Sequence, residues 1–190
     1  MEKIYSLDAL QRESQKGKSY EFLFFWGHTP PADGSINQSC LSQWWMQTFE
    51  IDGVHYSCAE QYMMAEKARL FNDANTLNRI MQASTPKQMK AYGRSVQDFE
   101  NELWEIRRYD IVKVANRAKF SQNAELLQFL LESGSRILVE ASPYDRIWGI
   151  GMKQNNRDAK DPMKWRGRNL LGFALTEVRD ELADKQSAIT

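Results

Sequence analysis

Hydrophobic and polar residues alternate with different periods along the chain, and the period predicts the secondary structure. The apolar run at residues 20–26 (YEFLFFW) lies between glycines and predicts a buried strand. Residues 48–56 alternate around Asp52-Gly53, which is typical of a β-hairpin. Residues 137–139 (ILV) predict one further short strand. The strands are therefore few and short.

Most other apolar positions recur at helical spacing. We expect helices at residues 7–16, 57–71, 72–83, 85–93, 99–118, 123–132 and 168–184. Ser57 and Glu60 match a capping box at the start of the second of these. The sequence shows no repeat or linker. It therefore predicts a mainly α fold, a single helical domain with a small β-hairpin or strand element.

Composition narrows the class of protein. The chain has 190 residues, 42% of them hydrophobic, and 25 basic residues balance 25 acidic ones. A neutral chain is a poor nonspecific binder of nucleic acid or membranes, although local basic patches leave nucleic acid open as a substrate. No apolar run approaches the roughly 18 residues of a membrane span, and the N-terminus does not resemble a signal peptide. With two cysteines, we expect a cytoplasmic protein.

The residue types also restrict the chemistry. His28, Cys40, His55 and Cys58 are the only histidines and cysteines, and their spacing is unlike that of a zinc site. The sequence contains neither a GxxxxGK[ST] nor a GxGxxG loop. We therefore expect chemistry from carboxylates, lysines, arginines and aromatic rings, with no metal and no cofactor.

The helix predicted at residues 57–71 carries two ionisable groups on an apolar face. Glu60, Met64 and Lys67 share this face with Met63 and Phe71. Burial would shift both groups toward neutrality, which suits an acid/base or a nucleophilic amine. Alternatively, Glu60 only caps the helix and the Lys67 ammonium reaches water. Spacing alone leaves both interpretations open.

Two later segments offer binding groups. At residues 144–151, Asp145 can orient a hydroxyl or water and Trp148 can stack on a flat ring, unless the segment is a capping turn with Trp148 in the core. The loop at residues 153–168 has a local charge of +4 and, with Asn169, could bind phosphate or sugar, or could simply be solvated. Basic residues on the long helix, including Arg108 and Lys119, are expected at the surface.

Several motifs together, in this order, resemble the NADAR (YbiA-like) family of N-glycosidases. They are FWG at 25–27, LSQW at 41–44, IDG at 51–53, AEQYMMAEKA at 59–68, GR at 93–94, AKF at 118–120, LVEAS at 138–142, DRIWGIG at 145–151 and WRGRNLLG at 165–172. The resemblance covers about residues 22–182. It implies a NADAR domain at residues 20–185 after an N-terminal extension at 1–19. Gln43 departs from the Asn found in many relatives.

The resemblance implies a reaction. Family members cleave early intermediates of riboflavin biosynthesis, or remove ADP-ribose from guanine in nucleic acid. It implies that Glu60, Lys67 and Asp145 act in catalysis without a metal or cofactor. It further implies a set of substrate-binding residues: Trp44, Met64, Arg94, Trp148, Gly149, Arg168 and Asn169. Among them, Trp44 or Trp148 would stack the base, and Arg94 with the basic loop would hold a phosphate.

Some alternatives remain open from sequence. Lys67 either attacks the anomeric carbon and forms a Schiff base, or stays charged while Glu60 or Asp145 activates water. A non-catalytic module that binds ADP-ribose or NAD would need the same aromatic and basic residues. The expected partner is a small-molecule N-glycoside or ADP-ribosylated nucleic acid, with no membrane partner. The sequence does not define the oligomeric state.

Overall fold

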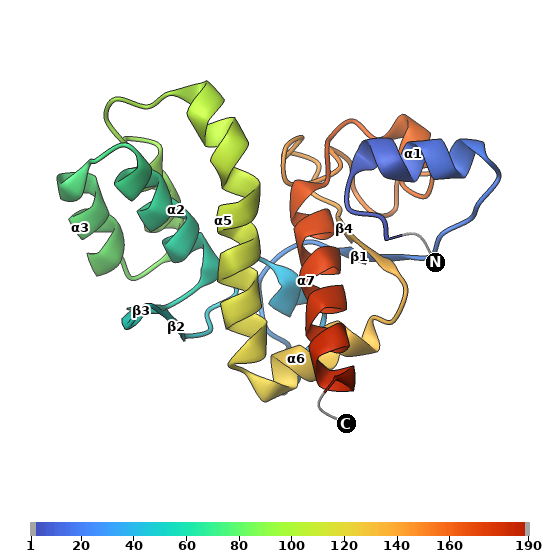
Figure 1. Cartoon of the computed structure of the whole chain (residues 1–190), viewed down its shortest axis with the longest axis horizontal. Coiled ribbons are helices and arrows are strands. Elements are labelled where there is room, and N and C mark those ends of the chain that lie inside the picture. Colours follow the sequence, from blue (N-terminus) through green and yellow to red (C-terminus); the bar gives the residue numbers. More distant parts are fainter. Residues whose placement is uncertain (1–2, 189–190) are drawn as a thin grey trace. The chain divides into compact units, whose positions relative to one another are not determined.

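The computed structural model describes residues 3–188 and is mainly helical over that range (Figure 1), which confirms the predicted fold class. Its α-helices are α1 (Leu7–Gln15), α2 (Ala59–Leu70), α3 (Ala74–Gln82), α4 (Pro86–Gly93), α5 (Asn101–Ser121), α6 (Ala124–Glu132) and α7 (Leu170–Ser187). Its strands are β1 (Phe22–Phe25), β2 (Phe49–Ile51), β3 (Val54–Tyr56) and β4 (Ile137–Glu140), and η1 (Gln38–Leu41) and η2 (Pro162–Lys164) are 3-10 helices. No helix within the described residues is long and apolar enough to cross a membrane.

The chain forms two compact units, each described by itself below. One comprises the chain up to Ser42 together with the chain from Glu125 onward. The other comprises Gln43–Ala124. The first unit is thus discontinuous in sequence.

The discontinuous unit is built on a parallel pair of strands. β1 pairs with β4, from Phe22 opposite Ile137 to Phe25 opposite Glu140. Helix α7 packs against β4. The prediction of a buried strand holds for Phe25, whereas the other three residues of β1 are half-buried. Half-burial is expected because β1 has only one neighbouring strand.

The continuous unit is built around α2. This helix packs against α3, α4 and α5, so every residue from Ala59 to Ala65 is buried. The predicted hairpin is present as β2 and β3, and its turn residues Asp52 and Gly53 both have positive φ, as a tight two-residue turn requires.

The structure corrects the start of α2. The predicted capping box at Ser57 and Glu60 is wrong, because the helix begins at Ala59 with Cys58 as a cap that makes no side-chain hydrogen bond. Instead, the Ser57 amide (2.8 Å) and hydroxyl (3.0 Å) donate to Oε1 of Gln61. The side chain that accepts from Ser57 is therefore that of Gln61 and not that of Glu60. Capping thus does not explain why Glu60 is buried.

The structure also corrects the long helix α5. Arg108 and Lys119, expected at the surface, are only 3% and 0% exposed. They lie on the same face as Val112 and Ala115, which are buried, because residues three and four apart share one side of a helix.

Candidate active site

The predicted site residues divide between the two units. Trp44, Glu60, Met64, Lys67 and Arg94 belong to the continuous unit. Asp145, Trp148, Gly149, Arg168 and Asn169 belong to the discontinuous unit. The contacts within each unit are as follows.

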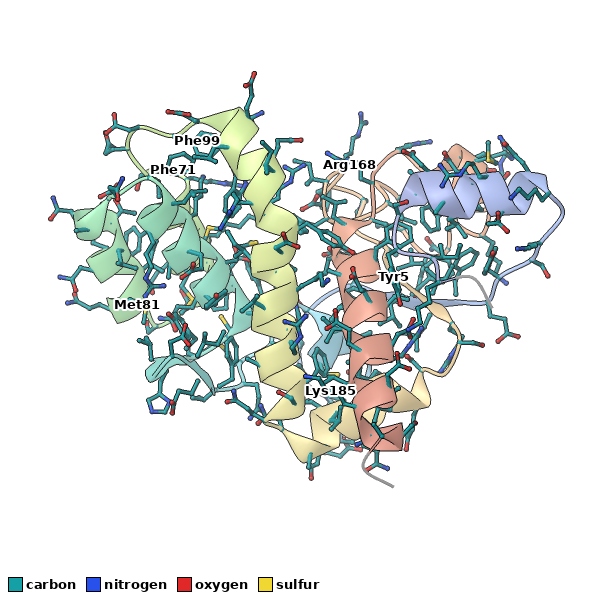
Figure 2. The ribbon with its side chains drawn as sticks, in the orientation of Figure 1. Tyr5, Phe71, Met81, Phe99, Arg168 and Lys185 are labelled. Carbon is teal, nitrogen blue, oxygen red and sulfur yellow. The ribbon has the colours of Figure 1, made fainter. Side chains whose placement is uncertain are left out.

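The amine of Lys67 has a well-defined position. It donates a hydrogen bond of 2.8 Å to the carbonyl oxygen of Gly93. It also lies 4.1 Å from the ring centroid of Phe99 and 5.7 Å from that of Trp104. Figure 2 shows Phe99 beside Phe71, and their ring centroids are 5.2 Å apart. Lys67 is therefore held in a partly aromatic environment.

This environment changes the titration of Lys67. Burial lowers the pKa of Lys67, and the positive charge of Arg94 lowers it further. The Gly93 carbonyl and the aromatic faces favour the ammonium form, but the net direction is downward. A larger fraction of neutral amine is thus present near pH 7 than for an ordinary lysine.

Met64 helps set the distance between α2 and α4. It is 6% exposed, and a Cβ at Gly93 would collide with its sulfur and lie 2.8 Å from its Cγ. The bare glycine lets α4 approach closely enough for its last carbonyl to reach Lys67. Met64 thus has a packing role in the structure, and its contact with substrate remains a prediction.

Glu60 lies at the first turn of α2 and is 2% exposed. Its amide donates to the Gln43 carbonyl at 2.9 Å. The Gln43 side chain accepts a 2.8 Å hydrogen bond from Asn116 of α5, which also donates to the Val112 carbonyl. Gln43 and Asn116 therefore anchor the backbone at Glu60, and no periodic pattern in the sequence predicts this link.

Glu60 and Lys67 share a face but are separated along it. Seven residues correspond to a rise of about 10 Å. The pKa of Lys67 is lowered by burial and by the charge of Arg94. This spacing is consistent with a nucleophilic amine at Lys67 that is kept apart from Glu60.

A second buried lysine lies near the start of α2. Burial raises the pKa of the Cys58 thiol to about 11, while the charge of Glu60 raises it and that of Lys119 lowers it. Both charges are thus within electrostatic reach of one thiol. Lys119 is fully buried on α5, although a lysine is ordinarily expected at the surface.

Positive charge gathers at the end of α4. Lys90 lies 5.6 Å from the ring centroid of Trp44, which is half-buried. Arg94 follows α4 directly and is exposed. With Lys67 hydrogen-bonded to Gly93, three cations lie around the last turn of this helix. Lys90 was not predicted, although its place one turn before Arg94 is readable from the sequence.

In the other unit, Asp145 shapes a turn. One of its carboxylate oxygens accepts hydrogen bonds from the amides of Ile147 (2.8 Å) and Trp148 (2.7 Å). Gly149 is buried, and a Cβ there would lie 2.8 Å from the Glu140 carbonyl oxygen. The capping-turn interpretation therefore describes Asp145, but Trp148 is only half-buried.

The two motifs at 145–151 and 165–172 form one assembly. The amides of Arg168, Asn169 and Leu171 donate to carbonyls of the first motif. The Asn169 side chain is fully buried, accepts from the Glu140 amide at 2.9 Å and donates to the Leu138 carbonyl at 3.0 Å. Asn169 therefore joins α7 to β4, whereas Arg168 is exposed (Figure 2).

The basic loop is ordered by its own contacts. Asn156 accepts from the Asp158 amide, and Lys164 pairs with Asp158 at 2.9 Å. The Trp165 indole donates to the Ala159 carbonyl. The positive charge of the basic loop is therefore partly neutralised by an aspartate of the same loop. Over residues 3–188, no group of three or more His, Cys, Asp or Glu is arranged to hold a metal.

Comparison with known proteins gives the class of this chain. A family model described as the NADAR domain matches residues 24–183, and the chain belongs to this family, as its motifs indicated. N-glycosidase R617 of Acanthamoeba polyphaga mimivirus is 43% identical over 146 residues, covering 74% of this chain and 86% of that protein. N-glycosidase YbiA of Escherichia coli (strain K12) is 31% identical over 134 residues, covering 70% and 75% respectively. The solved NMR structure of E. coli YbiA matches with a TM-score of 0.70 and 27% identity over 89% of both chains.

Proposed function

We propose that this N-glycosidase hydrolyses the bond between a phosphorylated ribose and a base. The candidate substrates are ADP-ribosyl guanine, in a nucleoside or nucleic acid, and an early ribosylamino-pyrimidine of riboflavin biosynthesis. The observation that carries the proposal is the position of Lys67. The Lys67 amine has a lowered pKa and lies against aromatic rings. It donates to the carbonyl of the last residue of α4, and Lys90 and Arg94 lie at this same end of α4. The amine suits an electrophilic anomeric carbon, and the two cations suit a phosphate.

The covalent route uses the neutral Lys67 amine as nucleophile. Its lone pair forms a bond to C1′ as the C1′–N bond to the base breaks, and protonated Glu60 supplies the proton that the departing base takes up. The sugar ring then opens as its oxygen gains the amine's proton, which leaves an iminium. Water adds to C1′, the C1′–N bond to Lys67 breaks, and the proton released in this step returns to Glu60. The neutral amine and the protonated carboxyl group are thereby regenerated, and the released sugar aldehyde closes to a ring again.

The direct route leaves Lys67 charged. Glu60 or Asp145 takes a proton from water, the water oxygen bonds to C1′, and the base departs with a proton. In this route Lys67 only binds a hydroxyl or phosphate. The lowered pKa of Lys67 favours the covalent route, because more of the amine is neutral than in an ordinary lysine.

Borohydride trapping tests the proposal. Protein is incubated with each candidate substrate, free base is measured by chromatography, and adducts are measured by intact mass after reduction. We expect free base and a reduced sugar adduct in the wild type, no adduct in Lys67→Ala, and an adduct in the control variant Lys90→Ala. Free base without any adduct would establish direct hydrolysis. Tight binding of ADP-ribose without release of base from any substrate would instead establish a binding module and contradict the proposal.

A further inference from the structure

A cavity of about 250 Å³ lies in the discontinuous unit, at the carboxyl ends of β1 and β4. Phe25 and Ala141, each 1% exposed, are its apolar lining. Ligands of open sheets with parallel strands bind preferentially at this end of the strands. The cavity contains none of the ten predicted site residues.

The polar residues that line this cavity have no side-chain partners among the described residues. Gln38, Lys153, Gln154 and Asn155 are its polar lining residues. Among the described residues, none of these four side chains takes part in a hydrogen bond or an ion pair. Elsewhere in the same loop, by contrast, Asn156 and Lys164 have partners within the loop. The loop residues that line the cavity are thus those whose side chains have no partner among the described residues.

One lining residue of the cavity, Trp26, belongs to an exposed aromatic pair. Trp26, which lines it, is 51% exposed and Tyr144 is 85% exposed. Their ring centroids are 6.3 Å apart with an interplanar angle of 57°. Exposed rings of this size contribute little to folding, but they are the platforms on which unpaired bases stack.

We propose that this cavity binds an unpaired nucleobase of a single-stranded nucleic acid. The Trp26 indole stacks on the base, the carboxamides supply both donors and acceptors to its edge, and Lys153 contacts the adjoining phosphate. The volume lies below the roughly 300–1,000 Å³ of pockets for drug-sized ligands, so it suits one base and not a whole ADP-ribose. A single strand fits because a duplex hides both the faces and the pairing edges of its bases.

This inference rests on the proposed function in one respect: the bound strand is taken to carry the modified nucleotide that the enzyme cleaves. It thus favours nucleic acid over the riboflavin intermediate as the physiological substrate. The site would hold a second nucleotide of that strand and raise its affinity over that of a free nucleoside.

Fluorescence anisotropy with a labelled single strand of about 12 nucleotides tests the site. We expect Trp26→Ala and Lys153→Ala each to weaken binding about tenfold, and Trp26→Phe to retain affinity within about threefold, because a phenyl ring still stacks. Lys153→Ala should reduce the salt slope of log K by about 0.7. Lys185→Ala is the matched control, an exposed lysine near the far end of α7 (Figure 2), and should change neither quantity.

The outcomes separate this inference from the proposed function. Equal affinity of wild type, Trp26→Ala and Lys153→Ala, with all three folded by circular dichroism, overturns the site. Binding of AMP as tight as that of the strand overturns the assignment to nucleic acid. Wild-type turnover of a small N-glycoside is measured in parallel. Turnover without strand binding defeats this inference alone, and strand binding at the site without any turnover defeats the proposed function alone.

Discussion

Lys67 of α2 and Gly93 of α4 are joined by a hydrogen bond of 2.8 Å from the amine to the carbonyl oxygen. Gly93 ends α4, and the carbonyls of a last helical turn lack partners within their helix and carry partial negative charge. The same glycine has no side chain to displace Met64. One residue therefore determines both where the amine points and how closely the two helices pack.

Gly93→Ala should destabilise the protein by about 1–3 kcal/mol, because the new methyl group overlaps Met64. Adding Met64→Ala should recover part of this loss, so the two substitutions should not be additive in urea denaturation. Strict additivity would show that the overlap is relieved elsewhere.

The rate should depend on pH through Lys67. Because its pKa lies below the ordinary value of 10.5, kcat should rise with pH and the midpoint of this rise should lie below 10.5 if the neutral amine attacks. Arg94→Gln removes a positive charge that lowers this pKa, so the rising limb should move to higher pH and kcat at pH 7 should fall. Arg79→Gln, which removes a cation lying over Tyr92, is the control. If the rising limb of the kcat–pH profile is unchanged in Arg94→Gln, kcat does not depend on the protonation of Lys67.

Glu60 and Gln61 should have separable roles. Glu60→Gln should reduce kcat on the order of 100-fold, as expected for lost proton transfer. Gln61→Ala should instead cost about 1–3 kcal/mol of stability with little change in kcat, because its side chain caps the start of α2 and donates to the Ile80 carbonyl. Steady-state kinetics and thermal unfolding of both variants check this. The reverse pattern would make Glu60 the structural residue.

The basic loop should bind substrate through its exposed arginine side chains. Replacing Arg166 and Arg168 by Gln should raise KM with kcat nearly unchanged. Lys164→Gln should leave KM unaltered, because that lysine is already paired with Asp158. A fall in kcat alone would assign the arginines to chemistry.

Asn169→Ala should destabilise the discontinuous unit by several kcal/mol, since it leaves the Glu140 amide and the Leu138 carbonyl without their side-chain partner. Asn169→Gly should cost no more than Ala does, because φ is 53° at this position. Stability is measured by urea denaturation, with KM measured on the folded protein. Unchanged stability with a raised KM would support the predicted contact with substrate.

Local signals in the sequence located most elements of the fold. Ser6, Asp73 and Thr85 cap α1, α3 and α4, and the cap of α4 is a capping box with Gln88. Such signals act over three or four residues, so they are readable without knowledge of the tertiary structure. The pairing of Ser57 with Gln61 was not predicted, because Glu60, one residue earlier, already fits the capping-box spacing from Ser57.

The site was less readable because its contacts join distant segments. The face shared by Glu60 and Lys67 follows from helical spacing, but the Gly93 carbonyl lies 26 residues from Lys67 and Asn116 lies 73 from Gln43. Lys119 falls on the apolar face of Val112 and Ala115 by helical spacing, but its burial also depends on the elements that cover this face, which the spacing does not identify. Periodicity predicts which face of a helix a side chain lies on, but it does not predict which other helix, strand or loop packs against that face.

The pairing of β1 with β4 also bears on how the chain is made. Phe22 lies opposite Ile137, so during synthesis β1 emerges from the ribosome more than a hundred residues before its partner strand. Throughout that interval the segment YEFLFFW has no strand to pair with, and it combines high β-propensity with few charges. The continuous unit consists of consecutive residues, 43–124, so it can fold first. Nascent chains arrested before residue 137 should therefore be the form of this protein most in need of a chaperone.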